Sequence, residues 1–383
     1  MKNLISFWEK ESFLQFDVVI VGGGLVGLST ACELIEREKN IKIAILERGI
    51  LPTGASTKNA GFACFGSPSE LLSDAKNYGW EYVLTFVEKR LRGLEKLEKR
   101  LGTKNIDLEK SYGGYEIIQP TQLYVIEQLN ELNQILKKVP FFENLPNKNN
   151  IYQSITKENI KKFGFENVNA MLHTPHEAQL HTGNMMKTLY LYAQKLGISI
   201  FTGAEVNHFE QQNQKVIINT TQNITFTSNY LLITNNSFYQ QFSNKNNIKA
   251  GRGQVFITKE LEKNLSFMGN FHLEEGFYYF RNVGKNRVLL GGGRNLDFEK
   301  ETTTDIEITD IIQNELEKKL KEIILPNQNF EIEMRWAGIM AFTDNHQPII
   351  EKISENIGVA VALNGMGVAI GTKVGEELVN LFF

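Results

Sequence analysis

Six residues near the N-terminus, Gly22-Gly23-Gly24-Leu25-Val26-Gly27, match the pattern G-x-G-x-x-G. In this pattern the first glycine permits a tight turn, the second lets the backbone approach a pyrophosphate, and the third lets a helix pack closely on a strand. The free N–H groups of the helix start then face the phosphates. Glu47 follows Gly27 by twenty positions, where an acid can accept hydrogen bonds from an adenosine ribose. These residues predict a dinucleotide site and argue against a ribose 2′-phosphate.

The fingerprint is informative only between a strand and a helix. Residues 17–21 are a short apolar, β-branched run, typical of a buried parallel strand. Residues 25–38 have helical spacing of apolar side chains, and residues 41–46 resemble a second strand that ends at Glu47. A β-α-β unit is therefore predicted. The alternative, a glycine-rich turn without a ligand, is disfavoured by the combination of strand, spacing, helix and acid.

Further elements are predicted from apolar periodicity. Amphipathic helices are expected over 81–101, 121–138, 183–196 and 308–323. Short strands are expected near 198–201, 215–219, 224–227, 229–234, 253–258, 277–281, 287–292 and 358–363.

Composition bounds the class of protein. The chain has 383 residues, 42% hydrophobic and 22% charged, which is ordinary globular usage. A formal net charge of −3 gives no sign of a nucleic-acid partner. Cys32 and Cys64 cannot form a disulfide framework and fit a reducing cytosol, so we expect a cytoplasmic protein. The longest uncharged run, 356–372, contains four glycines and falls short of the roughly 20 apolar residues of a spanning helix, so no transmembrane segment is expected.

The fingerprint does not choose between NAD and FAD. Downstream, Gly54-Ala55-Ser56-Thr57-Lys58-Asn59-Ala60-Gly61-Phe62 is rich in small residues and suits a loop laid along an extended ligand. Here the sequence resembles the D-amino acid oxidase-like (DAO) family of FAD-dependent oxidoreductases, whose fingerprint precedes a GAS-x-x-NAG-type loop beside the flavin. The resemblance implies FAD as cofactor. In these two segments it would be held by Gly22, Gly23, Gly24, Leu25, Val26, Gly27, Glu47, Arg48, Ser56, Thr57, Asn59, Ala60 and Gly61.

The resemblance extends over most of the chain. The helix after 181–184 leads to Val206, whose backbone would pair with adenine, and 277–281 with 287–293 resembles the substrate-domain sheet. Trp336-Ala337-Gly338 matches the W-x-G segment of the family. The C-terminal loop whose backbone would reach the flavin ring is Asn364-Gly365-Met366-Gly367-Val368.

The resemblance implies a discontinuous α/β Rossmann-like FAD-binding domain with an inserted α+β substrate domain built on an antiparallel sheet. The FAD-binding domain would comprise residues 1–85, 150–235 and 336–383. The substrate domain would comprise residues 86–149 and 236–335.

Two departures from the family pattern stand out. Glycine and D-amino acid oxidases carry an arginine shortly after the W-x-G that clamps the substrate carboxylate, whereas this chain has Met340 there. The pattern is closer to the γ-glutamylputrescine oxidase-like and glycine oxidase-like branch. The stretch 232–236 also lacks the glycine usual after this strand.

The family resemblance implies oxidation of the C–N bond of a small amine or amino acid by hydride transfer to flavin N5. Oxygen or another acceptor would then take the electrons. Arg281 and Tyr279 share one face of a predicted strand and would bound the substrate pocket; for Arg281 a surface ion pair is the alternative. Lys58 would favour negative charge on reduced flavin or on oxygen, with a solvated loop lysine as its alternative.

Other interpretations remain open. A 2-hydroxy-acid or other CH–OH dehydrogenase of the same fold, an NAD-dependent dehydrogenase, and a low-turnover flavin-binding interaction protein all share the fingerprint. His173, His176, Glu177 and His181 lie close together, but their spacing matches no zinc motif, so no metal is expected. Cys64 is interpreted as a small buried hydrophobic side chain rather than a flavin attachment point.

Overall fold

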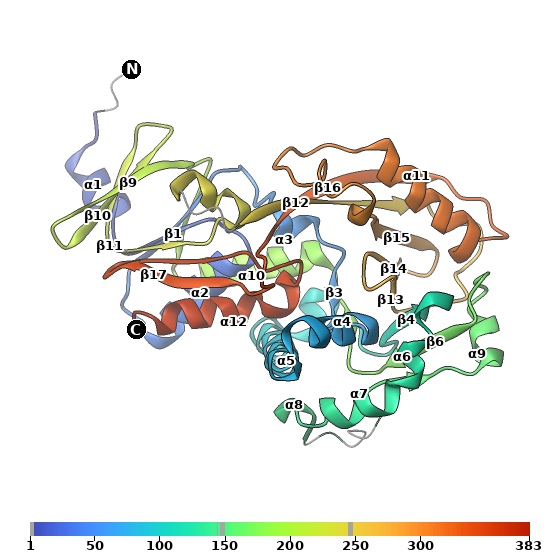
Figure 1. Cartoon of the computed structure of the whole chain (residues 1–383). Coiled ribbons are helices and arrows are strands. Elements are labelled where there is room, and N and C mark those ends of the chain that lie inside the picture. Colours follow the sequence, from blue (N-terminus) through green and yellow to red (C-terminus); the bar gives the residue numbers. More distant parts are fainter. Residues whose placement is uncertain (1–3, 144, 146–149, 244–247) are drawn as a thin grey trace.

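The computed structural model describes residues 4–143, 145, 150–243 and 248–383, and the described chain contains two large sheets (Figure 1). The first runs in the order β17-β18-β11-β1-β2-β8, and every pairing along it is parallel except that of β17 with β18. Its strands are β1 (Gln15–Val21), β2 (Ile43–Glu47), β8 (Ser199–Thr202), β11 (Thr225–Ile233), β17 (Ile349–Ser354) and β18 (Ile357–Val361). A parallel sheet joined through helices is the Rossmann-like architecture expected from the β-α-β unit.

Both faces of the first sheet are covered, which explains why its strands are apolar throughout. One face packs against α2 (Leu25–Arg37), α10 (Thr182–Lys195) and α12 (Gly367–Asn380). The hairpin of β9 (Val206–Gln212) and β10 (Lys215–Thr220) extends the same sheet, because β10 pairs with β11, and it contributes Val206, Val216 and Ile218 to the core on the other face.

The second sheet has the order β16-β12-β15-β14-β13-β4-β6-β5 and is antiparallel except where β13 pairs with β4. Its strands are β4 (Gly114–Ile118), β5 (Gln153–Ser154), β6 (Ala170–Thr174), β12 (Lys249–Thr258), β13 (Asn270–Leu273), β14 (Tyr278–Val283), β15 (Arg287–Gly292) and β16 (Ile332–Phe342). Helix α11 (Asp310–Lys319) buries Ile312 and Leu316 in the core of this sheet.

Helices also pack beside the two sheets. α5 (Trp80–Leu101) runs against α12 and against α4 (Pro68–Tyr78). The single helix predicted over 121–138 is instead divided into shorter helical pieces, which end in α7. The remaining elements are α1 (Phe7–Phe13), α3 (Ala55–Lys58), β3 (Phe62–Ala63), α6 (Tyr124–Glu127), α7 (Leu129–Leu136), α8 (Pro140–Glu143), α9 (Lys157–Lys162) and β7 (Ala178–Gln179), with short 3₁₀ or π turns at 103–106, 120–122, 236–242, 294–296 and 320–324.

In two places, a strand belongs to a different sheet from the one that the predicted domain boundaries imply. Strand β6, which falls in the predicted 150–235 FAD segment, pairs with β4 of the second sheet. Strand β16 also belongs to the second sheet, although residues 336 onward were assigned to the FAD domain. It stays in register with β12 over nearly its whole length, so the W-x-G motif is held by the second sheet. The predicted boundary at 149/150 falls at residues outside the described ranges.

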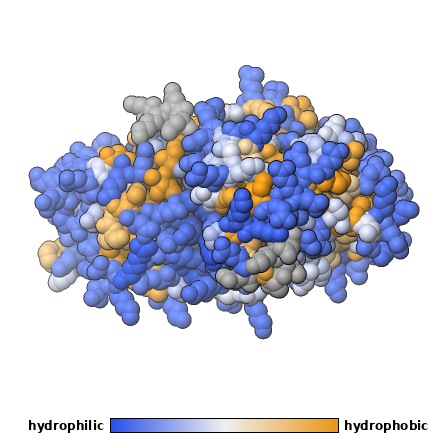
Figure 2. Space-filling view, turned by 60° about the horizontal axis from the view of Figure 1, so that its bottom comes forward, coloured by the Kyte–Doolittle hydropathy of each residue, from blue (hydrophilic) through white to orange (hydrophobic). Residues whose placement is uncertain are grey.

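Most of the surface in Figure 2 is hydrophilic, with hydrophobic residues in separate patches. Among the described helices none is both long and apolar enough to cross a bilayer.

Candidate active site

A cavity of about 590 Å³ begins at the glycine turn after β1 and extends to β14 and β16 of the second sheet. Its volume is in the range of small-molecule and cofactor sites. It gathers most of the predicted cofactor residues although they come from distant parts of the chain. The predicted site residues in its wall are Gly22, Gly24, Leu25, Val26, Glu47, Arg48, Ser56, Lys58, Asn59, Ala60, Gly61, Val206, Tyr279, Met340, Asn364, Gly365, Met366, Gly367 and Val368.

The glycine turn is held rigidly at the start of α2. The Gly23 N–H donates to Glu47 Oε2 at 2.8 Å, and the Leu25 N–H donates to Ser56 Oγ at 2.9 Å. Gly23 and Gly27 do not line the cavity. A Cβ on Gly27 would lie 2.0 Å from the Gly22 carbonyl oxygen, so this glycine sets the distance between turn and helix.

The loop after β2 is fastened by its own side chains. Thr57 Oγ1 donates to the Pro52 carbonyl at 2.8 Å and does not face the cavity. Asn59 Oδ1 accepts from the Gly61 N–H at 2.9 Å and from Thr182 Oγ1 at 3.0 Å. These contacts leave the backbone of the loop as one wall of the cavity.

The loop between β18 and α12 forms another part of the cavity wall. Its backbone adopts left-handed conformations at Ala362 (φ 61°), Asn364 (φ 52°) and Gly365 (φ 82°). Non-glycine residues hold such conformations only with support from their surroundings. Here the Asn364 side chain accepts a hydrogen bond from the Thr343 N–H at 2.8 Å, which fixes the loop to the end of β16.

At the end near β9, Arg48 stacks on the Phe238 ring at 3.7 Å, and Val206 lies beside them in the wall. Thr234 occupies the turn where the family usually has glycine, and its hydroxyl donates to the Val21 carbonyl at 2.9 Å. The neighbouring Asn235 Oδ1 is buried, lines the cavity and has no hydrogen-bond partner among the described residues. An unpaired buried acceptor in the wall indicates a polar ligand, so these residues fit an adenine dinucleotide.

The other end of the cavity is aromatic. Phe62 and Tyr279 meet edge to face with 5.6 Å between ring centroids. Burial raises the pKa of Tyr279 to about 12, so its phenol is neutral near pH 7. Met340 lies in the same wall, at the position where the family resemblance leads us to expect arginine. The Lys58 side chain also lines the cavity, while its carbonyl accepts a hydrogen bond from the Trp336 indole at 2.9 Å.

The structure places a different cation here, Arg294, which the sequence analysis did not identify. Arg294 lines the cavity and lies over the Phe342 ring at 4.1 Å. Its Nε is buried without a partner, and no ion pair joins the guanidinium to a carboxylate in the described part of the chain. Burial lowers the pKa of this guanidinium. Gly251 pairs directly with Met340, and a Cβ on Gly251 would lie 3.0 Å from Arg294 Cζ, so the cation lies beside the position of the missing arginine.

Arg281 is not in the cavity wall, contrary to the expectation that it bounds a substrate pocket. Its guanidinium donates to the Ala60 carbonyl at 2.6 Å, to Gln179 Oε1 at 3.1 Å and to the Leu180 carbonyl at 3.1 Å. It therefore ties the loop after β2 to β7. Alternation along β14 predicts the face of the strand on which Arg281 lies. The carbonyl groups that accept its hydrogen bonds, however, belong to segments far away in the sequence.

Replacing Arg281 by methionine should loosen this loop. The variant loses hydrogen bonds from a charged donor, each of which contributes on the order of 1.5–3 kcal/mol. We expect a lower flavin content and a free energy of unfolding reduced by about 3 kcal/mol, measured by denaturant unfolding of the flavin-loaded protein. Arg287→Met, which removes a surface ion pair with Glu333, is the matched control. Equal stability of the two variants would contradict this role.

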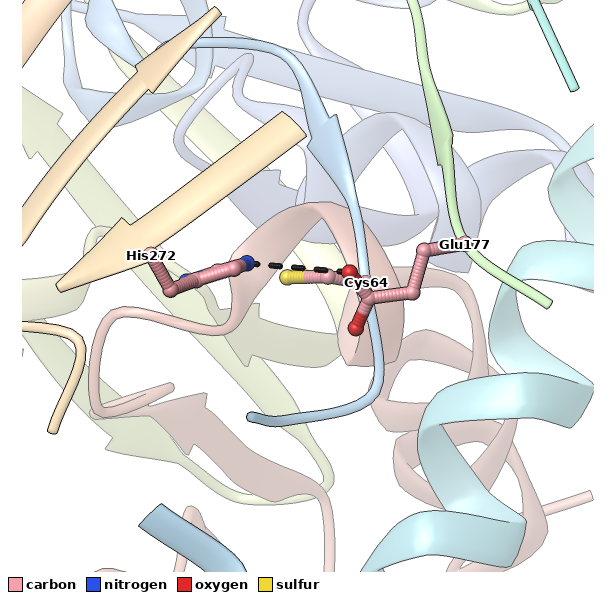
Figure 3. A group of neighbouring side chains, drawn as sticks. All are labelled: Cys64, Glu177 and His272. Atoms are coloured by element: carbon pink, nitrogen blue, oxygen red, sulfur yellow. Dashed lines mark ion pairs between the residues drawn. The ribbon is translucent and has the colours of Figure 1, made fainter. Parts of the chain in front are cut away.

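The histidines that lie near Glu177 in the sequence, His173, His176 and His181, do not form a group of possible metal ligands with it in the described part of the chain. Glu177 instead meets Cys64 and His272, with its Oε2 at 3.6 Å from His272 Nε2 (Figure 3). Cys64 is buried as expected, and burial raises the pKa of its thiol. It also lines the cavity, together with His272.

Comparison with known proteins agrees with this geometry. The family model described as DAO, FAD dependent oxidoreductase, matches residues 17–381. The chain is similar to the gamma-glutamylputrescine oxidoreductase of Escherichia coli, with 22% identity over 95% of this chain and 83% of that protein. Among solved structures, L-proline dehydrogenase from P. horikoshii superposes with a TM-score of 0.76 at 18% identity, covering 96% of this chain and 93% of that one. Glycine oxidase from Geobacillus kaustophilus gives 0.73 at 18% identity, covering 97% and 96%.

A family match over nearly the whole chain is far more specific than the glycine fingerprint. It confirms FAD rather than NAD as the dinucleotide, and the resemblance drawn from the separate sequence segments. The chain belongs to the DAO family and is an FAD-dependent oxidoreductase.

Proposed function

We propose that this enzyme oxidises the C–N bond of a small amine that carries a carboxylate, that is, an amino acid or an N-substituted amino acid. The observation that carries the proposal is Arg294, a guanidinium in the cavity wall without a carboxylate partner among the described residues. A partly buried cation without a counter-ion is costly, and a substrate anion would supply one. The names of the similar proteins, which include a glycine oxidase and a proline dehydrogenase, agree with this class.

The residues of the chain would orient the substrate and exclude water. FAD, when bound, supplies the hydride acceptor N5. The cavity residues must then hold a substrate C–H roughly 3–3.5 Å from it. Phe62 and Tyr279 form an apolar wall for this purpose, and Arg294 gives the carboxylate a fixed direction. A neutral amine is needed for the reaction, but a protein base is not obligatory.

Anaerobic mixing of the flavin-loaded protein with matched compounds tests the proposal. The panel contains amino acids, the amines that result from their decarboxylation, and the corresponding 2-hydroxy acids. Bleaching of the flavin absorbance by amino acids alone is the expected result. Bleaching by 2-hydroxy acids would favour the CH–OH alternative, and bleaching by amines without a carboxylate would overturn the role given to Arg294. A protein that no compound bleaches would be a low-turnover flavin-binding protein.

Lys58 provides a separate prediction for the electron acceptor step. Lys58 lines the cavity, and its ammonium group forms no ion pair with any described residue. Positive charge at this position would stabilise negative charge that develops when oxygen is reduced. Lys58→Met is expected to slow reoxidation by oxygen roughly 10- to 100-fold, as seen in stopped-flow absorbance, and to leave anaerobic bleaching unchanged.

Lys76, a charged residue of α4 outside the cavity wall, offers a matched control as Lys76→Met. Equal reoxidation rates in Lys58→Met and the native enzyme would exclude this role for Lys58.

A further inference from the structure

Three elements bring Cys64, Glu177 and His272 to one point behind the aromatic end of the cavity. Cys64 follows β3, Glu177 precedes β7, and β3 pairs with β7. His272 belongs to β13, which is linked to the same place because Asn270 Nδ2 donates to the Ala178 carbonyl at 2.6 Å. The cluster is therefore fixed by strand pairing rather than by flexible loops.

The donor atoms of these side chains converge, and His272 and Glu177 form an ion pair without a hydrogen bond. One donor atom from each residue lies within 4.8 Å of the other two, and all three residues are buried. His272 Nε2 lies 3.6 Å from Glu177 Oε2, too far for a hydrogen bond, and it has no hydrogen-bond partner among the residues that the structure describes. Figure 3 shows the Cys64 sulfur beside the line that joins these two atoms.

This separation suits a shared metal ion. Tetrahedral Zn²⁺ has Zn–N and Zn–O distances of about 2.0–2.1 Å and Zn–S of about 2.3 Å, which places neighbouring ligand atoms roughly 3.3–3.6 Å apart. Thiolate, imidazole and carboxylate are the three ligand types that zinc takes in proteins. A nucleophilic Cys-His-Glu arrangement would need different ring nitrogens of the histidine for its two partners. Here Nε2 faces the carboxylate, and the sulfur lies on the same side of the ring.

The carboxylate is held in place by its surroundings. Glu177 Oε1 accepts a hydrogen bond from the Phe65 N–H at 3.1 Å, which leaves Oε2 directed at the cluster. A Cβ on Gly114 would lie 2.0 Å from this Oε2, so only glycine leaves room for the carboxylate there. Partners that orient a ligand oxygen in this way are typical of metal centres.

We propose that Cys64, Glu177 and His272 bind one Zn²⁺ ion, with a fourth position open toward the cavity. The opening follows from the wall of the cavity, which contains Cys64 and His272 but not Glu177. Water, or an oxygen or nitrogen of a bound small molecule, would occupy that position. The site goes beyond the proposed oxidation and does not depend on it.

Metal analysis of the full-length, flavin-loaded protein tests the site. The protein is stripped with a chelator, reloaded with Zn²⁺ and measured for zinc and flavin in the same sample. We expect one zinc per chain, and an affinity reduced at least roughly 100-fold in Cys64→Ser and in His272→Ala. Cys32→Ser removes the other buried cysteine and should keep the full zinc content.

Substitution with Co²⁺ gives a spectroscopic readout of the thiolate ligand. Coordination by a thiolate produces a sulfur-to-cobalt charge-transfer band in the near ultraviolet, which we expect in the native protein and not after Cys64→Ser. The proposal is overturned if reloaded native protein with full flavin content holds no more zinc than the Cys64→Ser variant and shows no such band with Co²⁺. That result would leave the proposed oxidation intact, because flavin bleaching is measured independently.

Discussion

Replacing Gly27 by alanine is expected to give a protein without bound FAD. The new Cβ would lie 2.0 Å from the Gly22 carbonyl oxygen and 2.7 Å from Thr234 Oγ1. The closest of these atoms belongs to the backbone, so no side-chain rotation relieves the contact. The glycine turn must move away from the start of α2, and the N–H groups that would face the pyrophosphate lose their arrangement. The ratio of flavin to protein absorbance after purification measures the effect.

Gly183→Ala is the matched control. Gly183 lies in the first turn of α10, outside the cavity wall, and its new Cβ would meet only the His181 ring at 3.2 Å. This variant should retain its flavin. Soluble Gly27→Ala protein with a full complement of FAD would show that the close packing of turn and helix is not required.

Replacing Arg294 by methionine is expected to have the second large effect, on substrates that carry a carboxylate. Removing one partner of a desolvated charge pair costs about 2–5 kcal/mol, which corresponds to roughly a 30- to 4,000-fold loss of kcat/KM. Lysine should restore only part of this loss, because it cannot form the two parallel hydrogen bonds of a guanidinium. Steady-state kinetics with the amino acid that bleaches the flavin fastest provide the measurement.

A second substitution tests whether the loss of activity in Arg294→Met comes from the missing positive charge or from misfolding. Met340→Arg in the Arg294→Met background places a cation at the residue that pairs with Gly251, in the same cavity wall. We expect activity to recover with carboxylate substrates. Loss of activity in Arg294→Met that extends equally to amines without a carboxylate would contradict the proposed contact.

The parts of the site that the sequence predicts are those whose chemistry lies within a few consecutive residues. The fingerprint is local, because turn, helix start and strand end follow one another between β1 and β2. The loop around Ser56 and the loop around Asn364 could be predicted for the same reason, with help from the family resemblance.

Arg281 and Arg294 show where local patterns stop being sufficient. Alternation along β14 places Tyr279 and Arg281 on one face, but the partners of Arg281 belong to loops that meet only in the folded chain. Arg294 lies beyond the end of β15, where strand alternation no longer applies. Its approach to the place of the missing arginine depends on the register between β12 and β16.

The group of Cys64, Glu177 and His272 could not be predicted from the sequence for a related reason. A search for metal ligands by spacing finds His173, His176 and His181 near Glu177. The structure instead places Cys64 and His272 beside it, through β3–β7 pairing and the contact between β13 and β7. These three residues are far apart in the sequence, so no local spacing pattern could identify them as one group.

The packing of α12 on α2 joins segments that lie far apart in the sequence. Gly371 meets Leu25 and Gly375 meets Thr30 across this contact. Contacts of such long sequence separation require a large loop to close, which slows folding. A complete pocket for FAD is therefore expected to form late in folding.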